Sequence, residues 1–283
     1  MCPNCRAFIS ADDRVCPYCE VQLGPRAIDI RAAESFGGLI PRAYNTSIII
    51  LSTNIILYLL MVVLSVRLSE ASAGQALGEV WQGFSGQILA LFGAKYAPFI
   101  HHGQWWRLVT AGFLHGSLLH IAMNMWVMFE LVAEVEQFYG SSRLVIIYIF
   151  SSIAGFYLSL LWAPGSLSIG ASAACFGLIG CMMALGLRRD HPLAQAIRSY
   201  YRRWAIYGLI FSFMPFMHID IAAHVGGLAG GFLAGYVLGL PTPPGSRHER
   251  IVQVVAGIAL AITIYAFVQD VRFFHAVQSG SIG

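Results

Sequence analysis

The sequence predicts an all-α membrane protein with several transmembrane helices, preceded by a small cysteine-rich module. Of its 283 residues, 57% are hydrophobic and only 11% are charged, whereas a soluble domain carries roughly 25% charged residues. Several apolar segments have the roughly 17 to 25 residues that an α-helix needs to cross the hydrocarbon core of a bilayer. Residues 1–42 are instead polar, rich in Arg and Cys, and lack the apolar core of a signal peptide.

Seven apolar segments are predicted to span the bilayer. They are 47–66, 112–132, 144–163, 171–187, 204–219, 222–240 and 251–270. Between the first two, the long outer loop 68–110 is broken by Gly and Pro, so we expect an interfacial or re-entrant element there rather than a crossing helix. The predicted organisation is a module at 1–25, a linker at 26–46, a six-helix core at 47–240, and a loop, seventh helix and tail at 241–283.

The basic residues predict the orientation of these spans. Of the 17 Lys and Arg residues, thirteen precede the first span or lie in loops predicted on the same side of the membrane as the N-terminus. The other four are Arg67, Lys95, Arg107 and Arg272. Because loops rich in Lys and Arg stay in the cytoplasm, we expect the N-terminus inside and the C-terminus outside, as in a bacterial inner-membrane protein. The net charge of +3 follows from this topology and gives no reason to expect nucleic-acid binding.

Two CxxC pairs mark the N-terminal module. The motifs "CPNC" and "CPYC" are separated by ten residues. Each pair can present two thiolates to one tetrahedral Zn²⁺, and so short a module has too little core to fold without a crosslink. We therefore predict a zinc-ribbon-like site with a structural Zn²⁺ held by Cys2, Cys5, Cys16 and Cys19. Two disulfides are the alternative, which the reducing cytoplasm disfavours.

Polar side chains inside a span are energetically expensive, so each is a functional candidate. Those in the predicted spans include His115, His120, Asn124, Ser172 and His224. His120 and Asn124 are four residues apart and therefore share one face of a helix. On the predicted boundaries they lie about 8 to 12 residues deep, or about 12 to 18 Å, whereas Ser172 and His224 lie at the outer ends of their spans. We expect His120, Asn124, Ser172 and His224 to lie in the outer half of the bilayer.

Stripes of small residues accompany two of these side chains. Gly227 and Gly231 follow His224 on the same helix face. The span that begins near Ser172 carries its own stripe, formed by Ala173, Gly177 and Gly180. Close packing of the two spans would bring Ser172 and His224 together. Generic helix packing is the alternative, but it leaves His224 in lipid without a purpose.

Four motifs together resemble the rhomboid family of intramembrane serine proteases. In chain order they are "WWRLVTAGFLH", "HIAMNMW", "GASAACFG" and "AHVGGLAGG". The resemblance extends over about residues 47–240 and implies a six-helix core, followed here by a seventh helix in the six-plus-one form. It also implies that the substrates are transmembrane segments of other proteins in the lipid bilayer, and that catalysis needs no cofactor.

The resemblance implies a role for each matching residue. Ser172 would be the nucleophile and His224 its general base, with the side chains of His120 and Asn124 and the backbone N–H of Ser172 as an oxyanion hole. The supporting positions are Trp106, Arg107, Gly170, Phe176, Gly227 and Gly231, and the turn motif is formed by Glu136 and Gly140. The sequence departs from the family at Ala173, where many members have Gly, and at Phe176, where a Tyr often stacks on the histidine.

A serine–histidine dyad is the simplest chemistry for these residues. An imidazole can take the proton of an attacking serine, and the nearby carboxylate, Asp220, lies at the edge of its span. We therefore expect Phe176 to orient His224 by packing. His101 and His102 are expected in solvated loops, while His115 could equally line the mouth of a water-filled cavity. Pro215 would weaken the end of the fifth span, which makes that span a possible gate.

Three other functions compete with this interpretation. A different serine hydrolase fold is disfavoured because the GxSxG elbow fails at Ala174 and no strand precedes Ser172. A transporter would require carboxylates in the middle of the spans or an inverted repeat, and neither is found, since Glu130 and Asp270 lie near the ends of their predicted spans. A catalytically weak rhomboid-like chaperone or adaptor, acting through the zinc module on a cytoplasmic protein partner, remains the alternative. The two cysteines of the spans, Cys175 and Cys181, are expected to be packing residues.

Overall fold

The computed structural model describes most of the chain. The described residues are 5, 15–21, 45–68, 78, 80–187, 194–214, 219–243 and 245–280. The chain divides into two compact units, Met1–Asn45 and Thr46–Gly283, and each is considered by itself. Within the described part of the larger unit all regular structure is helical, apart from an antiparallel bridge between Lys95 and Ser168.

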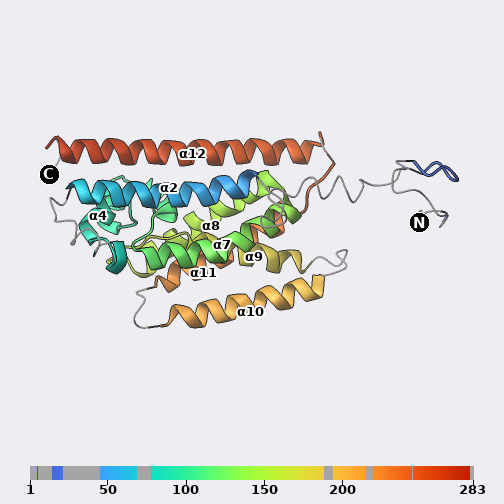
Figure 1. Ribbon diagram of the computed structural model, residues 1–283, viewed down its shortest axis with the longest axis horizontal. Coiled ribbons are helices and arrows are strands. Elements are labelled where there is room, and N and C mark those ends of the chain that lie inside the picture. Colours follow the sequence, from blue (N-terminus) through green and yellow to red (C-terminus); the bar gives the residue numbers. More distant parts are fainter. Residues whose placement is uncertain are drawn as a thin grey trace. The chain divides into compact units, whose positions relative to one another are not determined.

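The described part of the larger unit contains seven long helices, because its sequence is a series of largely apolar runs separated by loops that contain polar residues and Gly. They are α2 (Asn45–Leu68), α7 (Leu118–Tyr139), α8 (Ser141–Trp162), α9 (Ser172–Leu185), α10 (Ala194–Ser212), α11 (Ile221–Leu238) and α12 (Arg247–Gln278). The axes of these helices are nearly aligned, and α12 and α10 lie on opposite sides of the unit (Figure 1). Short helices fill the outer loop, namely α4 (Gly86–Leu91), α5 (Ala97–His101), α6 (Arg107–Thr110) and the 3₁₀ turn η1 (Ala111–Phe113).

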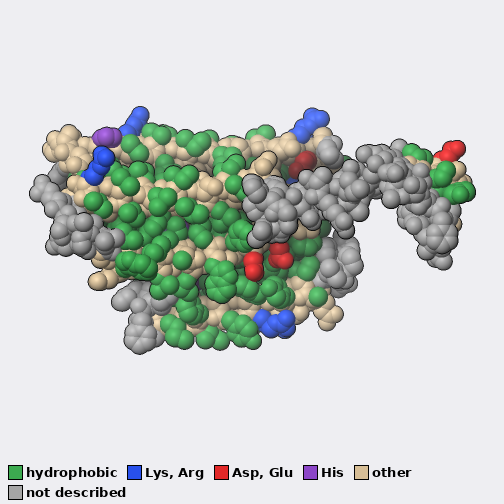
Figure 2. All heavy atoms as spheres, viewed as in Figure 1, with side chains coloured by type: hydrophobic (Ala, Val, Ile, Leu, Met, Phe, Trp, Pro, Cys, Tyr) green, Lys and Arg blue, Asp and Glu red, His purple; other side chains and the backbone are tan. Residues whose placement is uncertain are grey.

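Five of the described helices are long and apolar enough to cross a membrane, namely α2, α7, α8, α11 and α12. The apolar α9 has only 14 residues, and α10 has 19 residues but carries three arginines. Hydrophobic side chains cover the middle of the visible face, between charged groups nearer its two ends (Figure 2). The multi-pass membrane fold is therefore confirmed, while the six-plus-one count stays a prediction.

Several predicted boundaries were wrong. The second, fifth and seventh helices end at Tyr139, Ser212 and Gln278 rather than at 132, 219 and 270. The starts of two helices also differ clearly from the predicted ones. The second span begins at Leu118 rather than at 112, because the Ser117 side chain caps the helix by accepting a hydrogen bond from the N–H of His120 at 3.3 Å. The fifth helix begins at Ala194 rather than at 204. Its added residues include Ala, Gln and Arg, which are strong helix formers and let the helix continue through the basic segment.

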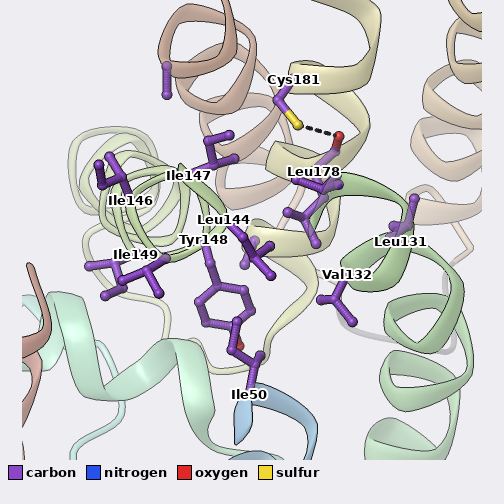
Figure 3. Packing of buried hydrophobic residues seen from close by; sticks show 14 of the residues in the cluster. Ile50, Leu131, Val132, Leu144, Ile146, Ile147, Tyr148, Ile149, Leu178 and Cys181 are labelled. Atoms are coloured by element: carbon purple, nitrogen blue, oxygen red, sulfur yellow. Dashed lines mark hydrogen bonds between the residues drawn. The ribbon is translucent and has the colours of Figure 1, made fainter. Parts of the chain in front are cut away.

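The interior is assembled around α8, α9 and α11. Between α7, α8 and α9 the packing is apolar, and Leu131, Leu144 and Leu178 belong to one cluster of buried side chains (Figure 3). In the same view the thiol of Cys181 donates a hydrogen bond to the carbonyl of Leu178 at 3.1 Å. Cys181 thus packs inside the bundle, as a buried apolar side chain would.

Glu136 ties the beginning of α2 to the junction between α7 and α8. Its carboxylate accepts hydrogen bonds from the backbone N–H of Ser47 at 2.9 Å, the hydroxyl of Ser47 at 2.6 Å and the hydroxyl of Ser141 at 2.6 Å. Gly140 allows the sharp turn between the helices, since its φ of 78° favours glycine. The Glu136–Gly140 motif therefore joins three helices at one end of the bundle.

Arg107 holds the outer loop together from inside. It is completely buried, and its guanidinium donates to the carbonyls of Ala90 at 2.6 Å and Ala94 at 3.1 Å. The rings of Phe99 and Phe273 lie 4.5 and 5.0 Å from it, a cation–π arrangement that brings in α12. Burial lowers the pKa of Arg107 to about 10, an effect that Asp270 of α12 partly offsets, so the side chain stays charged at neutral pH.

In the smaller unit, three cysteine sulfurs lie close together. The Sγ atoms of Cys5, Cys16 and Cys19 are all within 4.8 Å of one another, and those of Cys5 and Cys16 are 3.7 Å apart. Two thiolates on one tetrahedral Zn²⁺ are about 3.8 Å apart, given Zn–S bonds of about 2.3 Å. The spacing therefore fits a metal site. Cys2, the fourth predicted ligand, lies outside the described residues.

Candidate active site

Ser172 is the first residue of α9. Gly170, with φ of +126°, turns the chain into the helix, and its N–H donates to the carbonyl of Ala111 at 2.9 Å. The first helical hydrogen bond of α9 runs from the N–H of Cys175 to the carbonyl of Ala171. The N–H of Ser172 precedes this bond and is therefore one of the donors that a helix start leaves without a helical partner.

His224 is brought to Ser172 by close packing of α11 against α9. A Cβ at Gly227 would overlap the carbonyl oxygen of Ala173, so the two backbones touch only because glycine is present. His224 lies one turn earlier on α11, and its Nε2 is 2.8 Å from Oγ of Ser172. The two spans that carry Ser172 and His224 therefore pack closely, as predicted.

Phe176 stacks on the His224 ring, as expected. The ring centroids are 4.3 Å apart and the planes are inclined by 25°. On its other side Phe176 fits against α10, where a Cβ at Gly208 would lie 2.8 Å from Cζ of Phe176. The phenylalanine therefore fills the space between α10 and the imidazole without needing a hydroxyl.

Ser212 was missed by the sequence analysis. It is the last residue of α10, and its Oγ lies 2.7 Å from Nδ1 of His224. The sequence gives one serine among many near the end of an apolar helix, and only the packing of α10 against α9 and α11 shows which ring it meets. Both ring nitrogens of His224 therefore contact a serine hydroxyl.

His120 faces the same space from α7. The N–H of Gly116 donates to its Nδ1 at 3.3 Å, which places the hydrogen of a neutral ring on Nε2. A Cβ built on Gly170 would lie 2.8 Å from Nε2 of His120 and 3.6 Å from Oγ of Ser172. A small space free of side chain thus lies between an N–H donor and the serine hydroxyl.

Asn124 lies one turn further along α7. One of its amide hydrogens is donated to the carbonyl of His120 at 2.9 Å, and its Oδ1 lies 4.0 Å from Sγ of Cys175. The second amide hydrogen is available to another acceptor. Because α7 starts at Leu118, His120 and Asn124 lie near its beginning rather than deep in the span as predicted. They therefore belong to the same end of the bundle as Ser172.

Other predicted residues lie outside the cluster that consists of Ser172, His224, Phe176, Ser212, His120 and Asn124. Trp106 and Arg107 belong to the packed outer loop, and His101 and His102 are exposed at the end of α5. Gly231 lies further along the α9–α11 contact. These residues act on the fold rather than on the cluster.

His115 and Asp220 are two further residues near this cluster for which the sequence analysis stated an expectation. His115 is fully buried with its ring centroid 5.2 Å from that of His120, so it packs in the interior and does not line an exposed mouth. Asp220 caps α11 by accepting from the N–H of Ala223 at 2.9 Å and also accepts from the hydroxyl of Ser159, so each of its two oxygens has another hydrogen-bond partner. Pro215 lies outside the described residues.

The fold and the cluster define a class of protein: a polytopic membrane protein with a hydrogen-bonded serine–histidine pair at one end of its helix bundle. Comparison with known families agrees, since residues 102–241 match the family model described as "Rhomboid domain". The matched segment contains Ser172, His224, His120 and Asn124.

Several characterised proteins are similar in sequence. Rhomboid protease GluP of Bacillus subtilis is 36% identical over 176 residues, which are 62% of this chain and 34% of that protein. Rhomboid-like protease 3 of Toxoplasma gondii is 36% identical over 154 residues, 54% of this chain and 57% of that protein. RHOMBOID-like protein 7 of Arabidopsis thaliana is 32% identical over 176 residues, 62% and 56% of the two chains. The chain thus spans between about a third and somewhat over half of these relatives.

Proposed function

We propose that this protein is an intramembrane serine endopeptidase in which Ser172 is the nucleophile and His224 the general base. The observation that carries the proposal is the 2.8 Å separation between Oγ of Ser172 and Nε2 of His224. This distance lies within the range in which a base takes a proton from the nucleophile. Relatives named as rhomboid proteases support the same activity.

The reaction would proceed through an acyl-enzyme. Oγ of Ser172 attacks the peptide carbonyl carbon while its proton passes to Nε2 of His224. When the C–N bond breaks, the imidazolium gives this proton to the leaving amine. A water molecule then attacks the ester, again losing its proton to His224, and the carboxylic acid is released as Ser172 regains its hydrogen.

The carbonyl oxygen becomes negatively charged during each attack and requires hydrogen-bond donors. We assign this role to Nε2–H of His120, the free amide hydrogen of Asn124 and the backbone N–H of Ser172. The space that a Cβ of Gly170 would occupy lies 2.8 Å from Nε2 of His120. Donors at about 2.7 to 3.1 Å from the oxyanion suit this function.

The substrates would be transmembrane segments of other membrane proteins. The cluster lies at the end of the bundle where α7, α9 and α11 begin. We propose the predicted orientation, with the N-terminus in the cytoplasm and the site opening to the outer face. In this orientation a substrate helix would present its outer end to Ser172, where water is available for the second step. The proposal includes α9 and α10 as short spans, which completes the six-plus-one fold.

We propose a structural Zn²⁺ for the N-terminal module, held by Cys2, Cys5, Cys16 and Cys19. The sulfur spacing of the three described cysteines fits tetrahedral coordination. The ion would stabilise the fold of a segment that has little apolar core. Catalysis by Ser172 would not involve it. Binding of a cytoplasmic protein partner is a further possible role of the module.

The experiment that tests the proposed activity is covalent labelling with a fluorophosphonate probe. Wild type, Ser172→Ala and His224→Ala are compared in detergent micelles, and cleavage of a single-pass membrane protein is followed in parallel. We expect labelling and cleavage in the wild type alone. Equal labelling of all three proteins, or an unlabelled wild type that retains its native melting temperature, would contradict the proposal and leave the chaperone or adaptor alternative.

A further inference from the structure

We propose that Ser212 is a positioning residue of the active site, which holds the His224 ring in the state that can accept a proton from Ser172. The inference rests on the proposed function, because it assigns the imidazole the role of base. Ser212 is 3% exposed, and its Oγ lies 2.7 Å from Nδ1 of His224. The three residues come from α9, α10 and α11 and form one continuous line of hydrogen bonds.

The direction of these hydrogen bonds follows from the partner of Ser212. Its Oγ lies 2.8 Å from the carbonyl oxygen of Gly208, which can only accept. A serine hydroxyl has one hydrogen, so that hydrogen is used toward Gly208. The lone pair of Oγ must then accept the hydrogen of Nδ1 of His224.

This arrangement selects one tautomer of His224. A neutral imidazole has one hydrogen, and when it lies on Nδ1, the other nitrogen, Nε2, carries a lone pair. Nε2 is the atom that lies 2.8 Å from Oγ of Ser172. The hydroxyl of Ser172 therefore donates to a nitrogen that can take its proton during attack. In serine proteases built on other folds, a buried carboxylate holds the histidine in this way.

Among the described residues, no carboxylate takes this place. Asp220 is the acidic side chain nearest in sequence to His224, and both of its oxygens are engaged, one by the N–H of Ala223 and the other by Ser159. When the ring becomes an imidazolium, the bond from Nδ1–H to Ser212 becomes charge-assisted and therefore stronger. Ser212 thus stabilises the charged ring more than the neutral ring.

The same turn of α10 controls the His224 ring from a second direction. The absence of a side chain at Gly208 leaves room for Phe176, whose ring stacks on the imidazole at 4.3 Å. Ser212 contacts the edge of the imidazole of His224, whereas Gly208 makes room for Phe176, which packs on the face of the same imidazole. The position of α10 is therefore coupled to the geometry of the base.

The test compares four proteins by the rate of fluorophosphonate labelling. We expect Ser212→Ala to slow labelling about 10- to 100-fold, the effect of losing a hydrogen bond to a charged group. Ser212→Thr keeps the hydroxyl and should recover most of the rate. Ser199→Ala is the matched control, since Ser199 is on the same helix, is partly exposed and donates to the carbonyl of Ala196 at 3.0 Å in a solvent-exposed hydrogen bond. Its labelling should equal that of wild type.

A second measurement separates positioning from folding. Nitrogen NMR of ¹⁵N-histidine-labelled protein identifies the hydrogen-bearing ring atom, and His224→Asn assigns the signals. We expect Nδ1–H in the wild type and a growing share of Nε2–H in Ser212→Ala. Unchanged labelling in Ser212→Ala, or slow labelling with an unchanged tautomer and no recovery in Ser212→Thr, would overturn the inference. The NMR result stands even where the wild type fails to label, so failure of the proposed activity is distinguishable.

Discussion

Gly231 of α11 and Gly177 of α9 are in backbone contact, because a Cβ built on Gly231 would overlap the carbonyl group of Gly177. The same approach occurs one turn earlier, between Gly227 and Ala173. Interhelical contacts of this kind are typical of membrane helices with small residues at their interface. The distance between Ser172 and His224 depends on this contact, although neither glycine touches them.

Gly231→Ala is expected to push α9 and α11 apart. The added methyl meets backbone, which cannot move aside as a flexible side chain can, and overpacking of this kind costs about 1–3 kcal/mol. We expect a lower melting temperature and slower labelling of Ser172. Gly257→Ala in α12 is the control, since nothing lies within 4 Å of its Cβ position. Equal melting temperatures and labelling rates in the two variants would argue against the contact.

Gly170→Ala is expected to block the space assigned to the oxyanion. The new methyl would lie 2.8 Å from Nε2 of His120 and would also require φ of +126°, which L-residues rarely adopt. Labelling and peptide cleavage should both be lost. Gly165→Ala lies in the same connection between α8 and α9, has open space around its Cβ position, and should leave both activities intact. A fully active Gly170→Ala would mean that the oxyanion lies elsewhere.

His120→Ala is expected to reduce the turnover number by about 100- to 1,000-fold, the usual effect of removing one oxyanion donor. KM should change little, because the donor acts mainly on the transition state. The measurement is steady-state cleavage of a transmembrane substrate in proteoliposomes. His101→Ala, an exposed histidine at the end of α5, serves as the control. A rise in KM with an unchanged turnover number would instead assign His120 to substrate binding.

The N-terminal module should contain about one Zn²⁺ per chain when measured by elemental mass spectrometry, as expected for one Cys₄ site. Cys5→Ser should lose the ion, since it removes one of the clustered thiolates. Cys181→Ser alters a buried thiol inside the bundle and should retain it. A chelator that removes the ion should leave Ser172 labelling unchanged. Equal zinc contents in the two variants would contradict the assignment.

The sequence predicts the parts of this protein that depend on local pattern. Apolar runs locate the helices because their length must match the bilayer. The small residues around Ser172 and His224 predict which helices touch, because only glycine permits such close approach. The start of α7 was misplaced because Ser117 ends an apolar stretch whose first residues form a 3₁₀ turn, and hydropathy alone does not separate the two.

Contacts between distant segments are harder to predict. Ser212 contacts His224 only because α10 packs against α9 with Phe176 between them. Nothing in the spacing of these residues along the chain requires this contact. His115 looked equally suited to a wet cavity mouth and to the interior, because its burial depends on the turn that precedes α7. Tertiary packing, rather than helix periodicity, decides both outcomes.

The placement of Arg107 has a consequence for the order of events during synthesis. Its guanidinium lies between Phe99, from the outer loop, and Phe273, from the last helix of the chain. A ribosome releases α12 long after it has released the loop, so until then this cation lacks one of its two aromatic partners. The loop, which contacts the residues just before Ser172, can therefore reach its final form only when α12 has been translated.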